Sequence, residues 1–426
     1  MLEEVRETHG FVYACGRGAE PLPEKHVFDS VRSNLLGKGK EEHMIQKIKG
    51  YIKKEPVLCI ALLLAFVSMF WIHPDAGYVD YIDFRTLAIL FCLMAVVAGM
   101  KEIGVFDWFS QKLLLHVKGM WQVILILVLL CFFLSMAITN DVALITFVPL
   151  TIIVLGQLGE EKKRRWLLPV VVMQTVAANL GSMLTPIGNP QNLYLYGLAD
   201  MGFAEFVRLM LPYSLAALFL LLVWIALSVL GKRETAPITI HLPKTARVTD
   251  VRRLLMHLAL FLVCLLAVAH VLHYAVPLAL VLLLMLVTDR KVLKQVDYSL
   301  LGTFVGFFVF IGNMGRLEAF RSFLTTVIEG REMLTAVVAS QVMSNVPAAL
   351  LLSGFTDRYD LLLVGVNLGG LGTLIASMAS LISFKYIAQE DKGLQGRYLI
   401  RFTAANLVFL AAMLAVHFLI YHIGRQ

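Results

Sequence analysis

The amino-acid sequence predicts an all-α polytopic membrane protein made of two inverted repeats, each with a re-entrant hairpin and a broken helix. The composition is the first reason: of 426 residues, 59% are hydrophobic and 16% are charged, against about 25% charged in soluble domains. Second, several apolar stretches approach the roughly 20 residues that a bilayer-crossing helix needs. Third, the same order of apolar stretches and polar interruptions occurs twice. An ordinary soluble enzyme is therefore excluded.

The positive charges lie mostly in the connections between apolar stretches, where membrane proteins carry them on the cytoplasmic side. This placement explains the net charge of +7 without a nucleic-acid partner. Lysines precede the first apolar stretch and aspartates follow it, which predicts a multi-pass protein of the cell (inner or plasma) membrane with a cytoplasmic N-terminus. The predicted parts are a cytoplasmic N-terminal segment (1–55), a first transmembrane repeat (56–230), a cytoplasmic basic linker (231–253) and a second transmembrane repeat (254–426).

The first repeat contains two apolar arms that meet at Thr139-Asn140-Asp141. The flanking charges allow either two full spans or one re-entrant hairpin. The helix that follows is interrupted by Pro186 and Pro190, and proline removes a backbone donor, so we expect a break within 179–192. The predicted elements of this repeat are spans at 56–72 and 84–100, an amphipathic helix at 104–116, arms at 120–138 and 142–158, a broken helix at 166–196 and a span at 206–230.

The second repeat follows the same order with shorter arms. Its two arms meet at Ser344-Asn345, and each has too few residues to cross a bilayer at 1.5 Å per residue, so this hairpin must be re-entrant. A glycine-rich break is expected within 367–380. The predicted elements are spans at 254–271, 275–288 and 300–314, an amphipathic helix at 317–328, arms at 333–343 and 346–355, a broken helix at 361–382 and a last span at 402–419.

A direct match links the two halves: Asn179-Leu180-Gly181 recurs as Asn367-Leu368-Gly369. Element by element, Asp83 aligns with Asp297, Asn140 with Asn345, and Thr185 with Thr373. The flanking charges predict that the span at 84–100 and its counterpart at 300–314 cross the membrane in opposite directions. Inverted repeats with discontinuous helices are typical of secondary transporters that work by alternating access.

Broken backbone at membrane depth is tolerated only where protein or a water-filled cavity satisfies its polar groups. Helix N-termini at such places attract anions, whereas unwound carbonyls and amide or hydroxyl oxygens suit Na⁺. Asp141 stands within an apolar stretch, where a carboxylate costs about 2.5–3.5 kcal/mol on insertion scales. We therefore expect it to bind the coupling ion, H⁺ or Na⁺; capping of a helix that starts at Val142 is the alternative.

These motifs resemble the ion transporter superfamily. They are Thr139-Asn140-Asp141, the stretch from Ala178 to Asn192 that contains Thr185-Pro186-Ile187-Gly188-Asn189, and Ser344-Asn345-Val346-Pro347-Ala348. The superfamily includes citrate transporters, divalent anion:sodium symporters, arsenite permeases and related sodium/proton antiporters. The resemblance implies a homodimer in which a transport part moves like an elevator against a scaffold.

The resemblance also implies which residues form the site. Cation coupling would involve Asp141, Asn140, Gly181 and Thr185 in the first half and Asn345, Gly369 and Thr373 in the second, with Na⁺ near Asn140, Thr185 and Asn345. The substrate would be held by Thr139, Asn140, Asn189, Ser344, Asn345 and Thr373. The sodium-dicarboxylate members carry Ser-Asn-Thr at both hairpins, whereas here Asp141 and Val346 occupy the third positions, which argues against classical dicarboxylate binding.

The sequence thus predicts a cation-coupled secondary transporter of a small anion, either a carboxylate or an inorganic oxyanion. A sodium/proton antiporter and an arsenite-type efflux permease of the same fold are the alternatives. An enzyme is not expected, because neither an HExxH motif nor a Ser/His/Asp constellation at one depth is present. The expected partners are the lipid bilayer, the anion and a second copy of the chain, and no cofactor beyond Na⁺ or H⁺ is expected.

Overall fold

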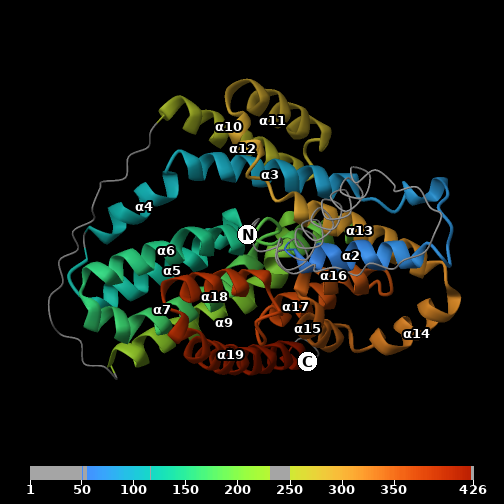
Figure 1. Ribbon diagram of the computed structural model, residues 1–426. Helices are drawn as coiled ribbons and strands as arrows, with labels where there is room; N and C mark the ends of the chain where they lie inside the picture. The colour runs from blue at the N-terminus through green and yellow to red at the C-terminus, as the bar shows by residue number, and fades with distance from the viewer. Residues whose placement is uncertain (1–49, 51–54, 116, 231–249, 424–426) are drawn as a thin grey trace, which may run out of the picture. The chain divides into compact units, whose positions relative to one another are not determined.

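The computed structural model describes residues 50, 55–115, 117–230 and 250–423, and in these residues it contains helices and no strands (Figure 1). The chain divides into two units, Met1–Pro56 and Val57–Gln426. Everything that follows concerns the second unit. The predicted N-terminal segment (1–55) and linker (231–253) lie almost entirely outside the described residues.

Eight of the described helices are long and apolar enough to cross a membrane, which confirms the prediction of an all-α polytopic protein. The first half contains α2 (Pro56–Ser68), α3 (Phe84–Glu102), α4 (Val105–Leu114), α5 (Met120–Ile138), α6 (Asn140–Gln157), α7 (Glu160–Gly181), α8 (Pro190–Leu198) and α9 (Phe203–Leu230). The second half contains α10 (Val251–Val268), α11 (Ala275–Thr288), α12 (Arg290–Leu293), α13 (Tyr298–Gly315), α14 (Glu318–Ile328), α15 (Glu332–Met343), α16 (Asn345–Ser353), α17 (Tyr359–Gly369), α18 (Met378–Glu390) and α19 (Gln395–Ile423).

Two helical hairpins, α5–α6 and α15–α16, each pack against the helix that follows, α7 or α17. The arms α15 and α16 have 12 and 9 residues, as short as the sequence predicts. The arms α5 and α6 have 19 and 18 residues, so each is long enough to span a bilayer by itself. Both following helices are interrupted within the predicted ranges: the first break covers 185–189 and the second break covers 370–377.

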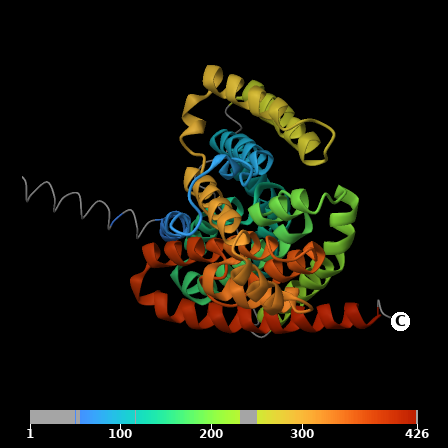
Figure 2. The same cartoon turned by 90° about the vertical axis from the view of Figure 1, so that its right-hand side faces the viewer.

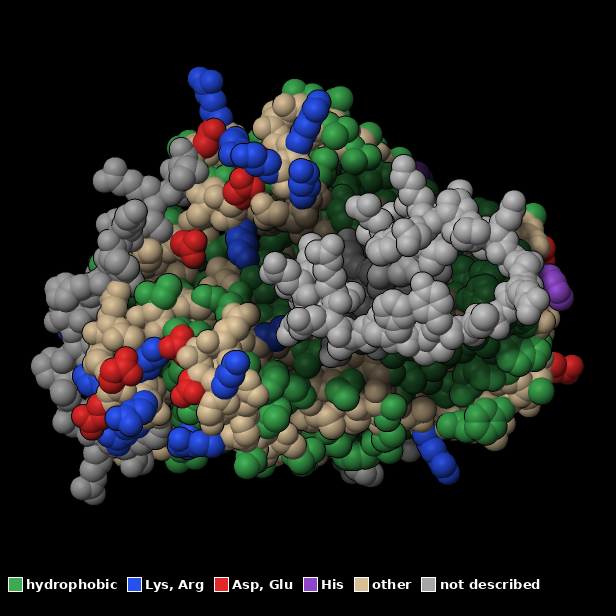
Figure 3. Space-filling model, in the orientation of Figure 1, with side chains coloured by type: hydrophobic (Ala, Val, Ile, Leu, Met, Phe, Trp, Pro, Cys, Tyr) green, Lys and Arg blue, Asp and Glu red, His purple; other side chains and the backbone are tan. Residues whose placement is uncertain are grey.

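Helix α7 forms the centre of the helical packing. Its membrane-length segment is 89% buried, because the side chains from Trp166 to Gly181 face neighbouring helices on nearly every side. Helices α9 and α19, in contrast, expose leucines and valines of the kind that face lipid. Figures 1 and 2 show α10 and α11 stacked on α3 at one side, with α19 along the opposite side. In Figure 3, hydrophobic side chains cover the lower edge of the molecule, and charged side chains gather at its left end.

Helices α3 and α13 begin in the same way. Asp83 and Asp297 are their N-caps, with φ/ψ of −79°/85° and −79°/84°. Each carboxylate accepts a hydrogen bond of 2.9 Å from the backbone N–H three residues later. This likeness supports the predicted alignment of the two residues; the opposite direction of the repeats in the membrane stays a prediction.

The connection before α3 is fastened to the end of α13. Arg316 donates to Asp75 at 2.6 Å and lies over the ring of Tyr81, 5.2 Å from its centroid. The guanidinium holds the pKa of the Asp75 carboxyl below its usual range. A group with a lowered pKa contributes stability at pH values above its unfolded-state pKa, and that contribution disappears as the pH falls through the folded-state pKa.

Removing this ion pair should therefore have a small effect that depends on pH. We expect Arg316→Gln to lower the Tm of the detergent-solubilised protein by about 1 °C at pH 7, because the pair is exposed to solvent. Below the folded-state pKa of Asp75 the two proteins should unfold at closer temperatures. A Tm difference that stays constant across the acid range would contradict this account.

Candidate functional site

The two hairpin tips share an unusual backbone. Thr139 has φ/ψ of 72°/153° and Ser344 has 78°/156°, a region that residues other than glycine rarely occupy. Each residue ends one arm and caps the next helix, which begins at Asn140 or Asn345. Such strain persists only where the surrounding structure holds it, and it is concentrated at functional sites. We call Thr139–Asp141 the first tip and Ser344–Val346 the second tip.

Each tip is bonded to the break of the helix in its own half. The backbone N–H of Asn140 donates to the carbonyl of Gly188 at 3.3 Å, and that of Asn345 donates to Ala376 at 3.0 Å. The alignment that pairs Thr185 with Thr373 also pairs Gly188 with Ala376, so these two bonds correspond. The breaks and tips thus satisfy one another's backbone groups, as unwound backbone at membrane depth requires.

The predicted threonines make a second pair of corresponding bonds. The hydroxyl of Thr185 donates to the carbonyl of Met136 in α5, and that of Thr373 donates to Gln341 in α15 at 3.1 Å. Gln341 is a residue that the sequence analysis missed. Its amide donates to the carbonyls of Gly369 and Leu371 at 2.9 Å each, so it fixes the second break.

The predicted glycines provide close packing. A Cβ atom at Gly181 would lie 2.0 Å from the carbonyl oxygen of Phe132, and one at Gly369 would lie 2.6 Å from the hydroxyl of Ser340. Both glycines therefore let α7 and α17 approach the hairpin arms. Because glycine has no side chain, these two residues can contribute to cation coupling only by allowing this close packing or by offering their backbone carbonyl groups to the cation.

Asn179 joins the two halves at the centre of the molecule. Its side-chain oxygen accepts from Asn140 at 3.0 Å and from Ser377 at 3.0 Å, and its amide nitrogen donates to the carbonyl of Gly370 at 3.4 Å. Asn345 contacts the same glycine from the second tip, since a Cβ at Gly370 would lie 3.0 Å from its amide nitrogen. The two tips are thus linked through Asn179 and Gly370.

A second amide network links the halves through Asn367. Its nitrogen donates to the side-chain oxygen of Asn192 at 2.7 Å, and its oxygen accepts from Asn189 at 3.4 Å. All three side chains are buried. Asn179 and Asn367 are the first residues of the repeated Asn-Leu-Gly motif, so the repeat pointed to both of them. The sequence analysis nevertheless predicted no function for either residue.

Asn367→Ala should destabilise the protein by about 1–3 kcal/mol, because it leaves the buried side-chain oxygen of Asn192 without its donor and removes the acceptor of the 3.4 Å bond from Asn189. The measurement is thermal unfolding in detergent. Asn406→Ala is a matched control: Asn406 is equally buried, and the one bond that its side chain makes among the described residues is to the carbonyl of Phe402 in its own helix. Equal losses in the two variants would show that the network adds nothing specific.

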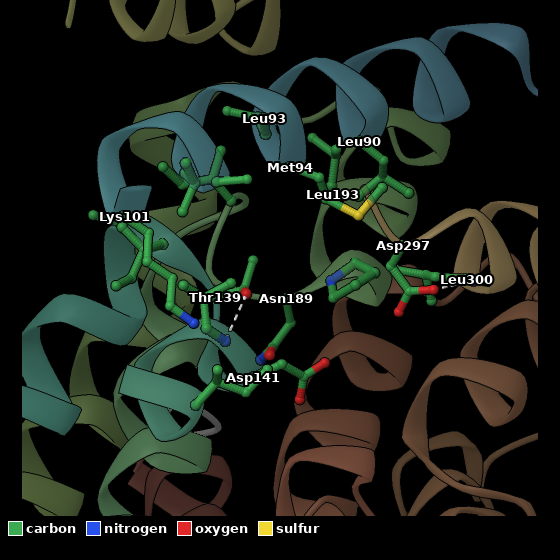
Figure 4. Close-up of a pocket in the computed structure, with 18 of the residues that line it drawn as sticks. Leu90, Leu93, Met94, Lys101, Thr139, Asp141, Asn189, Leu193, Asp297 and Leu300 are labelled. Atoms are coloured by element: carbon green, nitrogen blue, oxygen red, sulfur yellow. Dashed lines mark hydrogen bonds between the residues drawn. The ribbon is translucent and has the colours of Figure 1, made fainter. Parts of the chain in front are cut away.

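The first tip faces a pocket of about 190 Å³ (Figure 4). Apolar side chains of α3, α5, α6 and α8 form most of its wall, and we call it the charged pocket for its three ionisable side chains, Lys101, Asp141 and Asp297. Thr139 and Asn189 also line it, whereas Ser344, Asn345 and Thr373 lie at the second tip and second break and do not. The structure therefore gathers three of the predicted site residues here: Thr139, Asp141 and Asn189.

Asp141 is free for a ligand. The N-cap of α6 is Thr139, whose hydroxyl accepts from Val142, so capping by Asp141 is wrong: the helix begins before it, at Asn140. Within the described part of the chain, the Asp141 carboxylate has neither a hydrogen bond nor an ion pair. Its charge interacts with that of Asp297, and Figure 4 shows it extending toward the side of the pocket where Asp297 lies.

Lys101 and Asp297 are the charged residues that the sequence analysis missed. Lys101 lies in the last turn of α3 and reaches toward the tip in Figure 4, while Asp297 belongs to the connection between α12 and α13. The alignment of the two halves marked Asp297 as the counterpart of Asp83. The alignment did not indicate that Asp297 lies near Asp141.

Comparison with known proteins decides the family. The family model described as "Citrate transporter" matches residues 48–356. The chain belongs to the citrate transporter family. The matched range runs from the start of the first repeat to the end of the second hairpin, so it includes both tips and the first break, and the predicted resemblance to the ion transporter superfamily is confirmed.

The relatives of this family member include a named transporter and an inner membrane protein. An uncharacterized transporter of Methanocaldococcus jannaschii is 33% identical over 77% of this chain and 87% of its own length. The inner membrane protein YbiR of Escherichia coli is 32% identical over 76% of this chain and 86% of its own length. The P protein of Homo sapiens is 31% identical over 31% of this chain and 15% of its own length. With the helices described above, these likenesses identify a multi-pass membrane protein of the secondary transporter class.

Proposed function

We propose that this citrate transporter family member carries a small anion across the membrane together with Na⁺ or H⁺. The observation that carries the proposal is that one pocket is lined both by Asp141, whose carboxylate has no partner among the described residues, and by Lys101 with its ammonium group. Asp141 provides the place for the coupling cation, and Lys101 provides the attraction for the anion. Family membership supports the assignment as a secondary transporter. The charged side chains of the pocket support the proposal that a cation and an anion are carried together.

The charges of the pocket predict an order of binding. Lys101 contributes +1 while Asp141 and Asp297 contribute −2, so the ionised empty pocket has a formal charge of −1. An anion is repelled from such a pocket until a cation neutralises a carboxylate. Cation first and anion second is therefore the expected order, and a small monovalent anion fits better than a trivalent one.

The direction of access follows from the predicted topology. The flanking charges place the end of α3 and the start of α13 on the cytoplasmic side. Since Lys101 and Asp297 stand at these two ends, we interpret this conformation as the one in which the pocket faces the cytoplasm. The proposal includes the homodimer that the resemblance implies; light scattering after size-exclusion chromatography tests it.

A sodium/proton antiporter is the second candidate. Two carboxylates in one pocket favour it, because a shared proton or Na⁺ could be exchanged there without any anion. The arsenite-type permease has no structural feature in its favour and is tested by including arsenite among the substrates.

The deciding experiment is uptake into proteoliposomes under imposed Na⁺ or H⁺ gradients, with citrate, succinate, sulfate and arsenite as candidate substrates. We expect saturable uptake of one anion that requires one of the gradients. If no anion moves and a Na⁺ gradient drives proton flux instead, the antiporter replaces the symporter. Flux that neither saturates nor follows a cation gradient would overturn both.

A further inference from the structure

Asp297 lies in the charged pocket although it belongs to neither the tip nor the break. It is exposed to solvent, caps α13 and interacts electrostatically with Asp141. Asp83 has the same cap geometry at the start of α3 but does not line this pocket. One member of this repeated pair, Asp297, thus lines the pocket, and the other, Asp83, does not.

Asn189 gives independent evidence of a missing ligand. Its side chain is 2% exposed, and its amide nitrogen donates to Ser182 at 2.7 Å. Its oxygen has no hydrogen-bond partner among the described residues. Figure 4 shows this amide directed toward the part of the pocket where Asp141 lies. An unpaired buried acceptor is costly, so a donor or a cation is expected beside it.

We propose that the charged pocket contains a Na⁺ subsite at Asp141 and Asn189 for which Asp297 supplies the second negative charge. Two carboxylates, an amide and the hydroxyl of Thr139 belong to the residues that line the pocket, and oxygen atoms of these kinds are the ligands that hard cations prefer. Lys101, the other charge that lines the pocket, reaches it from α3. The inference rests on the proposed function and adds to it a residue outside the hairpin.

The placement of Asp297 has a consequence for coupling. Asp141 belongs to the hairpin, whereas Asp297 belongs to the start of α13, so a cation between them stabilises the conformation that brings these elements together. Without the cation, the two carboxylates repel each other in the same conformation. A ligand that binds one conformation better shifts the population toward it, and Na⁺ would do so here.

The test is binding of ²²Na⁺ to the purified full-length protein in detergent, with Asp297→Asn as the main variant. Asparagine is a good N-cap, so the start of α13 is retained while the charge is removed. We expect about tenfold weaker binding, the order of magnitude for one nearby charge. Asp83→Asn is the matched control and should bind like the wild type, and Asp297→Ser provides a second uncharged cap.

The outcomes separate this inference from the proposed function. Wild-type affinity in both Asp297 variants overturns the role of Asp297, and so does equal weakening in Asp83→Asn. If the wild-type protein binds no ²²Na⁺ across the range from pH 6 to 9, the Na⁺ subsite is wrong, while H⁺-driven anion uptake would leave the proposed function in place. If ²²Na⁺ binding depends on Asp297 but no anion is transported, the subsite holds and the symporter fails.

Discussion

Asp141→Asn should abolish the coupling of anion uptake to the cation gradient, with gradient-driven uptake reduced by about 100-fold or more. The carboxylate belongs to a residue that lines the charged pocket and has no partner in the described part of the chain, so it is the group that a cation would neutralise. A single carboxylate near a cation in a partly buried site contributes several kcal/mol, and an amide of the same shape contributes little of it. Because Thr139 caps α6, the variant should fold normally.

Initial uptake rates in proteoliposomes, with and without the gradient, measure this effect. Asp80→Asn is the control, since Asp80 is an exposed aspartate in the connection before α3. If the Asp141 variant still accumulates the anion against a gradient, the coupling ion binds elsewhere. If the variant still takes up the anion down the anion's own concentration gradient but no longer responds to the cation gradient, the substitution has removed coupling and has left anion binding intact.

The helices and tips were predictable because their signals are local. Apolar length marks a spanning helix, and proline and glycine mark the breaks, so the interruptions at 185–189 and 370–377 fall within the expected ranges. The short arms of the second hairpin required a turn at Ser344-Asn345. The first hairpin was ambiguous for the same reason, because arms of 19 and 18 residues satisfy either interpretation.

The charged pocket was not predictable from the same signals. Lys101 and Asp297 stand at the ends of helices, where charged residues are ordinary, and only the packing of α3 and α13 near the first tip brings them to Asp141. Sequence symmetry alone treats Asp83 and Asp297 alike. In the fold, Asp297 lines the same pocket as Asp141 of the first tip, whereas Asp83 does not line it.

Gly181→Ala should destabilise the protein strongly, by about 3 kcal/mol or more. The added Cβ would lie 2.0 Å from the backbone oxygen of Phe132, and a backbone atom cannot rotate away as a side chain can. Helix α5 would have to move away from α7. Because Thr185 bonds to the carbonyl of Met136 on the same arm, that movement would also displace the first break, and transport should fall with stability.

Gly156→Ala is the matched control for this substitution. Gly156 is also helical, in α6, and apart from the nearby backbone of its own helix no described atom lies within 4 Å of the position that its Cβ would take. Alanine there should be neutral or stabilising by up to about 1 kcal/mol, since it restricts the unfolded chain and favours helix. Thermal unfolding in detergent and uptake in proteoliposomes measure both variants. If Gly181→Ala unfolds at the same temperature as Gly156→Ala, α5 and α7 do not approach at this point, and the first tip must be held against its break by some other contact.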